Sequence, residues 1–404
     1  MMSKKSPQLR FEGFTDDWEQ RKLGSLTTVV RGASPRPIQD PKWFDKESDI
    51  GWLRIADVTE QNGRIYHLEQ HISKLGQEKT RVLTEPHLLL SIAATVGKPV
   101  VNYVKTGVHD GFLIFLNPTF EREFMFQWLE MFRPKWQKYG QPGSQVNLNS
   151  ELVRNQEIVL PNYKEQQKIG SFFKQLDETI ALHQRKLDLL KEQKKGYLQK
   201  MFPKNGAKVP ELRFAGFADD WEERKLKELG DIQTGNTPPT SDSDNYSLDG
   251  VLWVTPTDIK SLVISNTAKK LSQVGVTKAR IAKAGSILVT SIASIGKNTL
   301  LRMDAGFNQQ INSLTPTSEN DSYFLLTQSE KWSEKMKQTA ASATMQIVNK
   351  TDFSNISTYV PVHKEEQEKI GSFFKQLDDT IALHQRKLDL LKEQKKGFLQ
   401  KMFV

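Results

Sequence analysis

A glycine–lysine step near residue 296 is the segment that comes nearest to a catalytic phosphate-binding loop. Such a loop follows the pattern G-x-x-x-x-G-K-[S/T], because its backbone N–H groups cradle phosphates and its hydroxyl binds Mg²⁺. Gly296-Lys297 is present, but Ser291 replaces the first glycine and Asn298 replaces the hydroxyl residue. We therefore expect no nucleotide hydrolysis at this segment.

Three further segments approach catalytic motifs and depart from them. Residues 236–239 (Asn-Thr-Pro-Pro) differ from the Asn-Pro-Pro-aromatic motif of adenine methyltransferases at Thr237. Residues 67–71 place the glutamate one position too late for a zinc-protease H-E-x-x-H helix. Glu192 and Lys194 have a nuclease-like spacing, but they lie in a long helical pattern. Since the chain also has no cysteine, we predict no catalytic residue and no metal site.

The composition favours a polyanionic partner. The 404 residues include 57 Lys+Arg against 48 Asp+Glu, which gives a formal charge of +9 and a pI near 9.3. The polar N-terminus lacks a signal-type apolar core, and no apolar run approaches the roughly 20 residues of a membrane helix. We expect a cytoplasmic protein of two or more domains with no membrane contact.

Two segments of the chain occur twice, almost unchanged. Residues 9–23 recur at 212–226 with 12 of 15 positions identical, and residues 168–202 recur at 369–403 with 33 of 35 identical. The intervening stretches, roughly 24–160 and 227–360, share only a skeleton of short motifs. The plan is therefore a constant lead-in, a variable part and a constant helix, repeated once.

Each variable stretch predicts an α+β domain, because short β-rich runs bounded by turn residues alternate with amphipathic helical segments. In these runs Trp52 and Trp253 have apolar neighbours and are expected in the cores. The predicted organisation is a first domain at 1–160 with its lead-in at 9–23, a central helix at 161–202, a linker at 203–210, a second domain at 211–360 with its lead-in at 212–226, and a C-terminal helix at 361–404.

The duplicated segment has the heptad pattern of a coiled coil. Apolar residues recur at spacings of three and four over four to five heptads without proline, and a helix of this length spans about 50 Å. The predicted seam comprises Phe173, Leu176, Ile180, Leu187, Leu190, Phe374, Leu377, Ile381, Leu388 and Leu391.

Two arrangements of these helices are open: each packs on its own domain as a surface helix, or the two copies pair with each other. Near-identity favours pairing within the molecule, since a covalent partner has a high effective concentration. An antiparallel pair would separate the two globular domains and give the chain an approximate two-fold axis. Polar residues in the seam (His183, His384, Lys194 and Lys395) would then set the register.

The order of these motifs resembles the specificity subunit of type I DNA restriction–modification systems. The resemblance covers nearly the whole chain and rests on pairs of motifs repeated in the same order. They are residues 32–35 and 235–238, Trp52…Asp57 and Trp253…Asp258, Ile92…Gly97 and Ile292…Gly296, and Pro161…Glu165-Gln166 and Pro361…Glu366-Gln367. Residues 306–310 have only a loose counterpart at 108–112, which leaves a base-reading role for that loop of the first domain open.

The resemblance implies a non-catalytic DNA-reading scaffold. Each variable domain would be a target-recognition domain for one half of a bipartite, asymmetric site in double-stranded DNA. The helices would space the domains and dock two adenine methyltransferase subunits, and two restriction nuclease/translocase subunits would join outside them. S-adenosylmethionine, ATP and Mg²⁺ would belong to the partner subunits, and this chain would bind no cofactor.

We expect basic side chains to contact phosphates and polar side chains to contact base edges, and we expect both in the loops beside β-runs. Lys98 and Lys297 share a Gly-Lys step and are the preferred phosphate contacts. The DNA-binding candidates are Arg31, Arg36, Lys42, Arg54, Lys98, Ser144, Gln145, Asn147, Asn236, Thr237, Ser241, Thr257, Lys297, Asn298, Arg302, Gln309, Thr344 and Gln346.

Two other functions compete with DNA reading. A coiled-coil adaptor whose variable domains bind proteins fits the helices, although the basic charge and divergent loops argue against it. An enzyme with an unrecognised nucleotide site at the two Gly-Lys steps is the third interpretation. Association with methyltransferase subunits and methylation at a split site would favour the first function. Turnover by the isolated chain would favour the enzyme.

Overall fold

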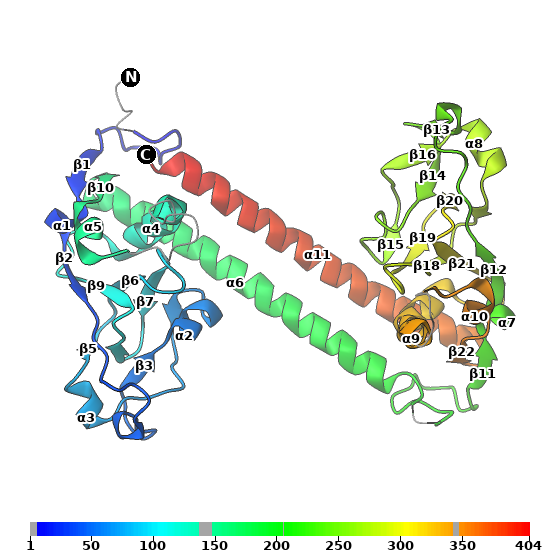
Figure 1. Ribbon diagram of the computed structural model, residues 1–404, viewed down its shortest axis with the longest axis horizontal. Helices are drawn as coiled ribbons and strands as arrows, with labels where there is room; N and C mark the ends of the chain where they lie inside the picture. The colour runs from blue at the N-terminus through cyan, green and yellow to red at the C-terminus, as the bar shows by residue number, and fades with distance from the viewer. Residues whose placement is uncertain (1–5, 137–147, 205, 342–346) are drawn as a thin grey trace. The chain divides into compact units, whose positions relative to one another are not determined.

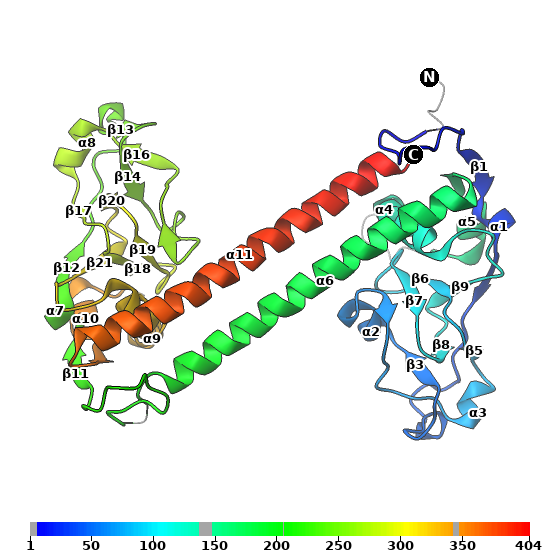
Figure 2. The same ribbon diagram turned by 180° about the vertical axis from the view of Figure 1, so that it is seen from behind.

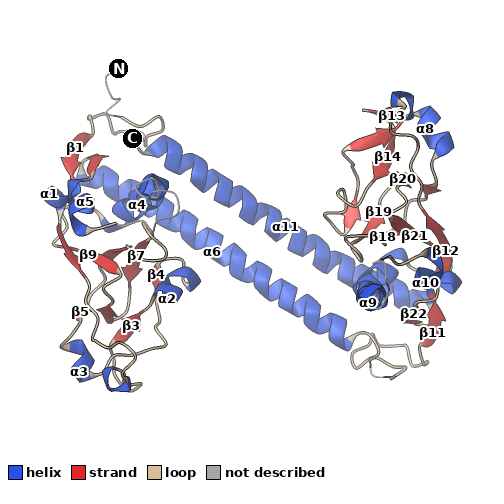
Figure 3. Cartoon of the chain, viewed as in Figure 1, coloured by secondary structure: helices blue, strands red, loops and turns tan. Residues whose placement is uncertain are grey.

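The chain divides into two compact units of mixed α and β structure. The computed structural model describes residues 6–136, 148–204, 206–341 and 347–404. Unit 1 comprises Met1–Gln184 and Arg386–Val404, and unit 2 comprises Arg185–Gln385. Each unit therefore holds a globular part and a segment of both long helices (Figure 1). The strands lie in the globular parts (Figure 3).

Unit 1 contains three sheets. The five-stranded sheet has the order β2-β9-β6-β7-β4, in which only β4 and β7 pair in parallel. A smaller sheet has the order β3-β8-β5, and β1 pairs with β10. The strands are β1 (Glu19–Lys22), β2 (Thr28–Arg31), β3 (Gly51–Leu53), β4 (Arg64–Ile65), β5 (Arg81–Leu83), β6 (Leu88–Ser91), β7 (Pro99–Asn102), β8 (Thr106–Val108), β9 (Phe112–Leu116) and β10 (Glu157–Leu160).

The five-stranded sheet of unit 1 separates two apolar cores. Successive side chains of a strand point to opposite faces, so a strand covered on both sides is apolar throughout. In β9, Leu113 and Phe115 enter a core shared with the long helices, whereas Phe112 and Ile114 enter a core shared with the smaller sheet. The uninterrupted apolar run of β9 follows from this double burial.

The helices of unit 1 pack mainly on the first of these cores. The longest within the globular part contributes Phe124, Trp128 and Trp136 to it, and Trp136 is fully buried. The helices are α1 (Leu23–Leu26), η1 (Pro41–Trp43), α2 (Ile55–Glu60), α3 (Lys74–Gln77), α4 (Arg122–Trp136), α5 (Ser150–Asn155) and α6 (Tyr163–Lys200), of which α6 continues into unit 2.

Unit 2 repeats the main sheet and the two-stranded sheet, and its second sheet has two additional strands, β13 and β16. Its main sheet has the order β12-β21-β18-β19-β15, its second sheet β13-β16-β14-β20-β17, and β11 pairs with β22. As predicted, Trp52 and Trp253 are core residues, with exposed fractions of 2 % and 3 %. The strands are β11 (Glu222–Lys225), β12 (Gly230–Thr234), β13 (Tyr246–Ser247), β14 (Val251–Val254), β15 (Val263–Ile264), β16 (Lys269–Leu271), β17 (Ile281–Ala282), β18 (Ile287–Thr290), β19 (Asn298–Leu301), β20 (Ala305–Phe307), β21 (Ile311–Pro316) and β22 (Ser357–Val360). The helices are α7 (Leu226–Leu229), η3 (Ser243–Asn245), α8 (Gln273–Lys278), α9 (Ser322–Ala341), α10 (Lys350–Ser354) and α11 (Lys364–Met402).

Within each unit the segments of α6 and α11 lie side by side in antiparallel orientation (Figures 1 and 2). In unit 1 the ring of Phe172 lies 5.1 Å from that of Phe398, and Asp177 binds Lys395 at 2.5 Å. Partner numbers therefore fall along α11 as they rise along α6. The antiparallel coiled coil predicted from the heptads is confirmed, and the surface-helix alternative is wrong.

The same register holds in unit 2 through equivalent residues. Lys194 binds Asp378 at 2.6 Å, and the rings of Tyr197 and Phe373 lie 5.0 Å apart. Lys194 and Lys395 were predicted to set the register, and each contacts an aspartate on the opposite helix. Because the four carboxylate and ammonium side chains are 10–18 % exposed, a register slip would bury unpaired charge.

In each unit the constant lead-in contacts the C-terminal end of one long helix and the N-terminal end of the other. In unit 1 Arg10 forms two hydrogen bonds of 2.7 Å with the fully buried carboxylate of Glu165, and the backbone N–H of Leu9 donates to the carbonyl of Lys401. In unit 2 Arg213 binds Glu366 in the same way, and the N–H of Leu212 donates to the carbonyl of Lys200. The lead-in therefore caps the end of one helix and neutralises a buried acid at the start of the other.

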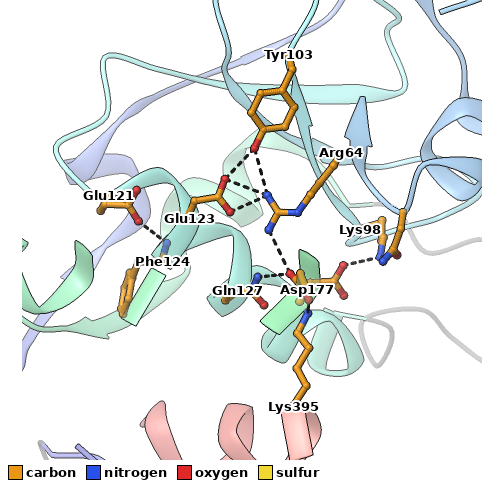
Figure 4. A network of polar contacts seen from close by, with 11 residues as sticks. Arg64, Lys98, Tyr103, Glu121, Glu123, Phe124, Gln127, Asp177 and Lys395 are labelled. Carbon is orange, nitrogen blue, oxygen red and sulfur yellow. Dashed lines mark hydrogen bonds and ion pairs between the residues drawn. The ribbon is translucent and has the colours of Figure 1, made fainter. Parts of the chain in front are cut away.

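A charged network joins the globular part of unit 1 to its helices (Figure 4). Arg64 on β4 binds Glu123 of α4 at 2.7 Å and Asp177 of α6 at 3.2 Å. Burial opposes the charge of Arg64, but the two carboxylates outweigh it and raise its pKa. Burial, followed by the nearby Glu123 carboxylate, raises the pKa of Tyr103 to about 12.

Within the described residues, no helix has the length and apolar character needed to cross a membrane.

Candidate nucleic-acid interface

Three loops of each unit converge at one end of the main sheet. Loop A follows the first strand of this sheet (32–40 in unit 1, 235–242 in unit 2). Loop B joins β8 to β9 (109–111) and β20 to β21 (308–310), and loop C joins β6 to β7 (92–98) and β18 to β19 (291–297). Since neighbouring antiparallel strands place one strand's end beside the next strand's start, these three loops share an edge.

Loops A and B are joined by backbone and side-chain bonds. In unit 1 the N–H of Ala33 donates to the carbonyl of Val108 at 3.0 Å, and the Ser34 hydroxyl donates to the Asp110 carboxylate at 2.8 Å. In unit 2 the N–H of Asn236 donates to the carbonyl of Phe307, and the Thr237 hydroxyl donates to the Gln309 amide oxygen. The two units thus present different side chains on one backbone arrangement.

The glycine at the start of loop A is required by a close backbone approach. A Cβ atom at Gly32 would lie 2.1 Å from the carbonyl oxygen of His109, and one at Gly235 would lie 2.2 Å from that of Asn308. Both distances are far below van der Waals contact, so only glycine fits.

Loop C has the same strained backbone in both units. Ala94 and Ala293 have φ angles of 54° and 61°, and Gly97 and Gly296 have 77° and 86°. An alanine in the left-handed region is costly and persists only where its surroundings fix it. Loop B helps to fix loop C in unit 1, because the N–H of Ile92 donates to the carbonyl of Gly111 at 2.8 Å.

Sequence reasoning missed an arginine that supports loop A in each unit. The Arg81 side chain donates to the carbonyl of Arg31 at 2.7 Å, and Arg280 donates to the carbonyl of Thr234. The signal was present in the sequence, since Lys-Thr-Arg at 79–81 and Lys-Ala-Arg at 278–280 occupy equivalent positions.

The predicted alignment of loop B in the first half with loop B in the second half was wrong by one residue. Gly32 donates to the carbonyl of Phe112, whereas Gly235 donates to that of Ile311. These bonds align Asp110 with Gln309, so the counterpart of residues 306–310 is 107–111 and not 108–112. Few identical residues span this loop, so the register became visible only through the backbone bonds.

The predicted DNA contacts of unit 1 fall into two groups. Arg31 and Arg36 are exposed at loop A, with Arg36 bound to Asp110. Lys42 and Arg54 lie beside it: Lys42 binds Asp40, and Arg54 binds Asp57 and Glu69. Lys98 is different. Its side chain is 14 % exposed and binds Glu130 at 2.6 Å, so a phosphate would have to displace a carboxylate.

The predicted contacts of unit 2 divide similarly. Asn236 is held on both sides, by the Lys278 carbonyl and the Arg280 N–H, each at 2.6 Å. Asn298 is half-buried and donates to Ser333 at 3.4 Å. The exposed residues are Thr237, Ser241, Thr257, Lys297, Arg302 and Gln309. Ser144, Gln145, Asn147, Thr344 and Gln346 lie outside the described residues.

The charge at loop B of unit 1 is fixed by its neighbours. Burial acts to raise the pKa of Asp110, but the Ser34 hydroxyl, His109 and the nearby arginines outweigh it and leave this pKa below its usual value. Burial lowers the pKa of His109. Asp110 therefore carries a negative charge at neutral pH, where His109 is mainly uncharged.

Beneath loop A of unit 1 lies a cavity of about 590 Å³. Its walls are largely apolar, and its polar lining comes from Gln39, Arg54, Gln70 and His109. Among the described residues, no cluster of three or more histidine and acidic side chains is placed to hold a metal ion.

The predicted seam residues lie inward. Phe173, Leu187, Leu190, Phe374 and Leu388 are buried. Leu176, Ile180, Leu377, Ile381 and Leu391 are half-buried. Contacts with another molecule would therefore use other faces of α6 and α11.

Comparison with known proteins gives a consistent result. A family model described as the type I restriction modification DNA specificity domain matches residues 15–192 and 218–393. The type I restriction enzyme MjaIX specificity subunit of Methanocaldococcus jannaschii is 26% identical over 43% of this chain and 41% of its own length. The putative MjaX specificity subunit of the same organism is 20% identical over 95% of this chain and 92% of its own length.

A solved structure shares the fold. The S subunit of a type I restriction–modification system from M. genitalium superposes with a TM-score of 0.70 at 13% identity, covering 99% of both chains. The two matched segments span most of the sequence and coincide with its repeats. The chain belongs to the type I restriction–modification DNA specificity family.

Proposed function

We propose that this chain is the DNA-reading subunit of a type I restriction–modification complex and carries out no catalysis itself. Each unit reads one half of a bipartite, asymmetric site in double-stranded DNA through loops A, B and C. The complex then methylates or cleaves according to the state of that site.

One observation supports this proposal above the others: the loops keep their backbone geometry while their side chains change. The bond between loops A and B joins a serine to an aspartate in unit 1 and a threonine to a glutamine in unit 2. Meanwhile the lead-ins and the long helices, which hold the two globular parts, are nearly identical in sequence. A reader of two different half-sites needs this combination, because base-edge contacts must differ while assembly contacts stay constant.

A domain exchange tests this proposal. Residues 24–160 are replaced by the corresponding segment of a relative with a different target, and the chain is expressed with its methyltransferase subunit. Long-read sequencing then maps methylated adenines. We expect a split motif in which one half changes and the other stays. A contiguous motif, or a change in both halves, would contradict separate reading.

The outer faces of α6 and α11 are proposed to dock two methyltransferase subunits. Leu182 and Leu390 are 63 % and 58 % exposed in unit 1, and Leu189 and Leu383 are 52 % and 58 % exposed in unit 2. Leu182 is equivalent to Leu383, and Leu189 to Leu390. Each unit thus exposes one leucine from each helix, which suits two identical partners.

Substitution of these leucines tests the docking surface. We expect Leu182→Glu with Leu390→Glu to reduce the methyltransferase content of the purified complex from two copies to one. Ala181→Glu, at an exposed position about 100° around the same helix from Leu182, is the matched control. Retention of both copies by the leucine variant, measured by native mass spectrometry, would place the docking surface elsewhere.

The remaining chemistry is assigned to partners. We propose that S-adenosylmethionine is bound by the methyltransferase subunits, and ATP with Mg²⁺ by two nuclease/translocase subunits. The basic charge of this chain supports a role for it in contacting the DNA backbone.

A further inference from the structure

Arg36 combines exposure with a fixed orientation. Its side chain is 75 % exposed, yet one Nη donates to the carboxylate of Asp110 at 2.7 Å. An exposed ion pair of this kind adds little to stability, on the order of 0–1 kcal/mol. Its effect is to restrict where the remaining N–H groups of the guanidinium point.

Asp110 is itself held by Ser34 of loop A and by Arg31 at the end of β2. Its second carboxylate oxygen accepts from the Ser34 hydroxyl at 2.8 Å, and its backbone N–H donates back to that hydroxyl at 3.1 Å. Its carbonyl accepts from Arg31 at 2.7 Å. The carboxylate is thus a rigid support, and Arg36 rests on it.

Other arginines of unit 1 are used differently. Arg54 is paired with two carboxylates, those of Asp57 and Glu69. Arg64 is buried in the network of Figure 4, and Arg81 supports the backbone of loop A. Arg36 differs from these three because it is an exposed fork in loop A whose carboxylate support, Asp110 of loop B, is itself largely sheltered.

We propose that Arg36 is a specificity-determining residue that reads a guanine in the half-site bound by unit 1, with Asp110 as its positioning residue. An arginine fork donates in bidentate fashion to the O6 and N7 acceptors of guanine in the major groove. Unit 2 has Pro239 at the position of Arg36 and Gln309 at that of Asp110, so it lacks this reader. This inference rests on the proposed function and adds to it the base that one side chain recognises.

The test compares Arg36→Lys, Arg36→Ala and Asp110→Ala in the full chain with its methyltransferase subunits. Methylation mapping first identifies the half-site of unit 1 by the domain exchange described above. We expect that half to contain a required guanine. Both Arg36 variants should relax that position alone and reduce guanine-over-adenine discrimination in duplex binding by about 5- to 150-fold. Asp110→Ala should relax the same position to a smaller extent.

Lysine helps to separate base reading from phosphate binding, because it keeps the charge but loses the planar fork that donates two parallel hydrogen bonds. If Arg36→Lys keeps the motif while Arg36→Ala weakens all sites equally, Arg36 is a phosphate contact and the proposal is overturned. Arg21→Lys is the matched control, since Arg21 is an exposed arginine on β1 paired with exposed Glu19, and it should change nothing. The other specified bases of the unit 1 half-site report that unit 1 is folded in each variant.

The two levels of the hypothesis fail differently. A wild-type complex without a split motif would contradict the proposed function, and the role of Arg36 would be rejected with it. A split motif whose unit 1 half has no guanine, or does not respond to the Arg36 variants, would overturn the role of Arg36 alone.

Discussion

At the scale of single residues, backbone constraints shape the loops as much as side-chain chemistry does. Gly97 adopts a φ of +77°, and a Cβ atom there would lie 3.1 Å from both Arg133 Cγ and Trp136 Cε3. Gly196, inside α6, has open space in the Cβ direction. The same substitution therefore has opposite expected effects at the two positions.

We expect Gly97→Ala to reduce the free energy of unfolding by about 1–2 kcal/mol, because alanine is strained in the left-handed region and its methyl group would press on α4. Gly196→Ala should increase it by about 0.5–1 kcal/mol, since glycine weakens a helix interior. Urea denaturation followed by circular dichroism measures both. An increase in stability for Gly97→Ala would contradict the strain described for loop C.

Residue types alone suggested candidates for the interface but did not reveal the contacts that these side chains make within the chain. Arg31 and Arg36 were recognisable because exposed basic residues in a Gly/Pro loop suit DNA. By contrast, the ion pair between Lys98 and Glu130 joins a loop to a helix 32 positions later, and no local sequence pattern predicts it. The role of Asp110 was hidden for the same reason, since its partners lie in loop A.

At the scale of elements, the helix pair was the most predictable feature. The heptads fixed which faces meet, and the near-identity of the copies indicated mutual pairing. The aspartates that receive Lys194 and Lys395 were not predicted, because Asp177 and Asp378 lie beside the seam rather than in it. The lead-in was seen to repeat, but its bonds to Glu165 and Glu366 needed coordinates.

The interhelical ion pair of unit 2 offers a test of register. Asp378 is 10 % exposed and also accepts a hydrogen bond from Tyr323 at 3.1 Å, whereas its neighbour Asp379 is 68 % exposed. Asp378→Ala leaves the sheltered ammonium of Lys194 unpaired and should cost about 3–5 kcal/mol. Asp379→Ala should cost at most about 0.5 kcal/mol.

Denaturation midpoints of the two variants measure this difference. A charge exchange, Lys194→Asp with Asp378→Lys, should recover part of the loss, because it restores opposite charges at the same pair. Equal midpoints for the Asp378 and Asp379 variants would mean that this ion pair does not hold the helices in register.

At the scale of the whole molecule, duplication explains how one chain could serve the two half-sites proposed above. Identical helices and lead-ins provide the same frame twice, and the variable loops differ on it. The sequence revealed this plan directly, because repeats need no structural knowledge to detect. Which bases the loops would recognise depends on side-chain orientation, which no repeat encodes.

The bonds of the lead-ins allow a prediction about chain order. Leu212 follows Lys200 by twelve positions, and joining Val404 directly to Met1 would place Leu9 the same twelve positions after Lys401. We therefore expect a permuted chain, opened within residues 203–210 and closed from 404 to 1, to fold and to direct methylation to the unaltered motif. Loss of both folding and methylation would show that the two junctions are not equivalent.

The hydrogen bond from Leu9 to the end of α11 thus has a meaning beyond capping a helix. It is the same contact between a lead-in and a helix end that Leu212 makes with Lys200 in unit 2. These contacts therefore do not fix which of the two units comes first along the polypeptide.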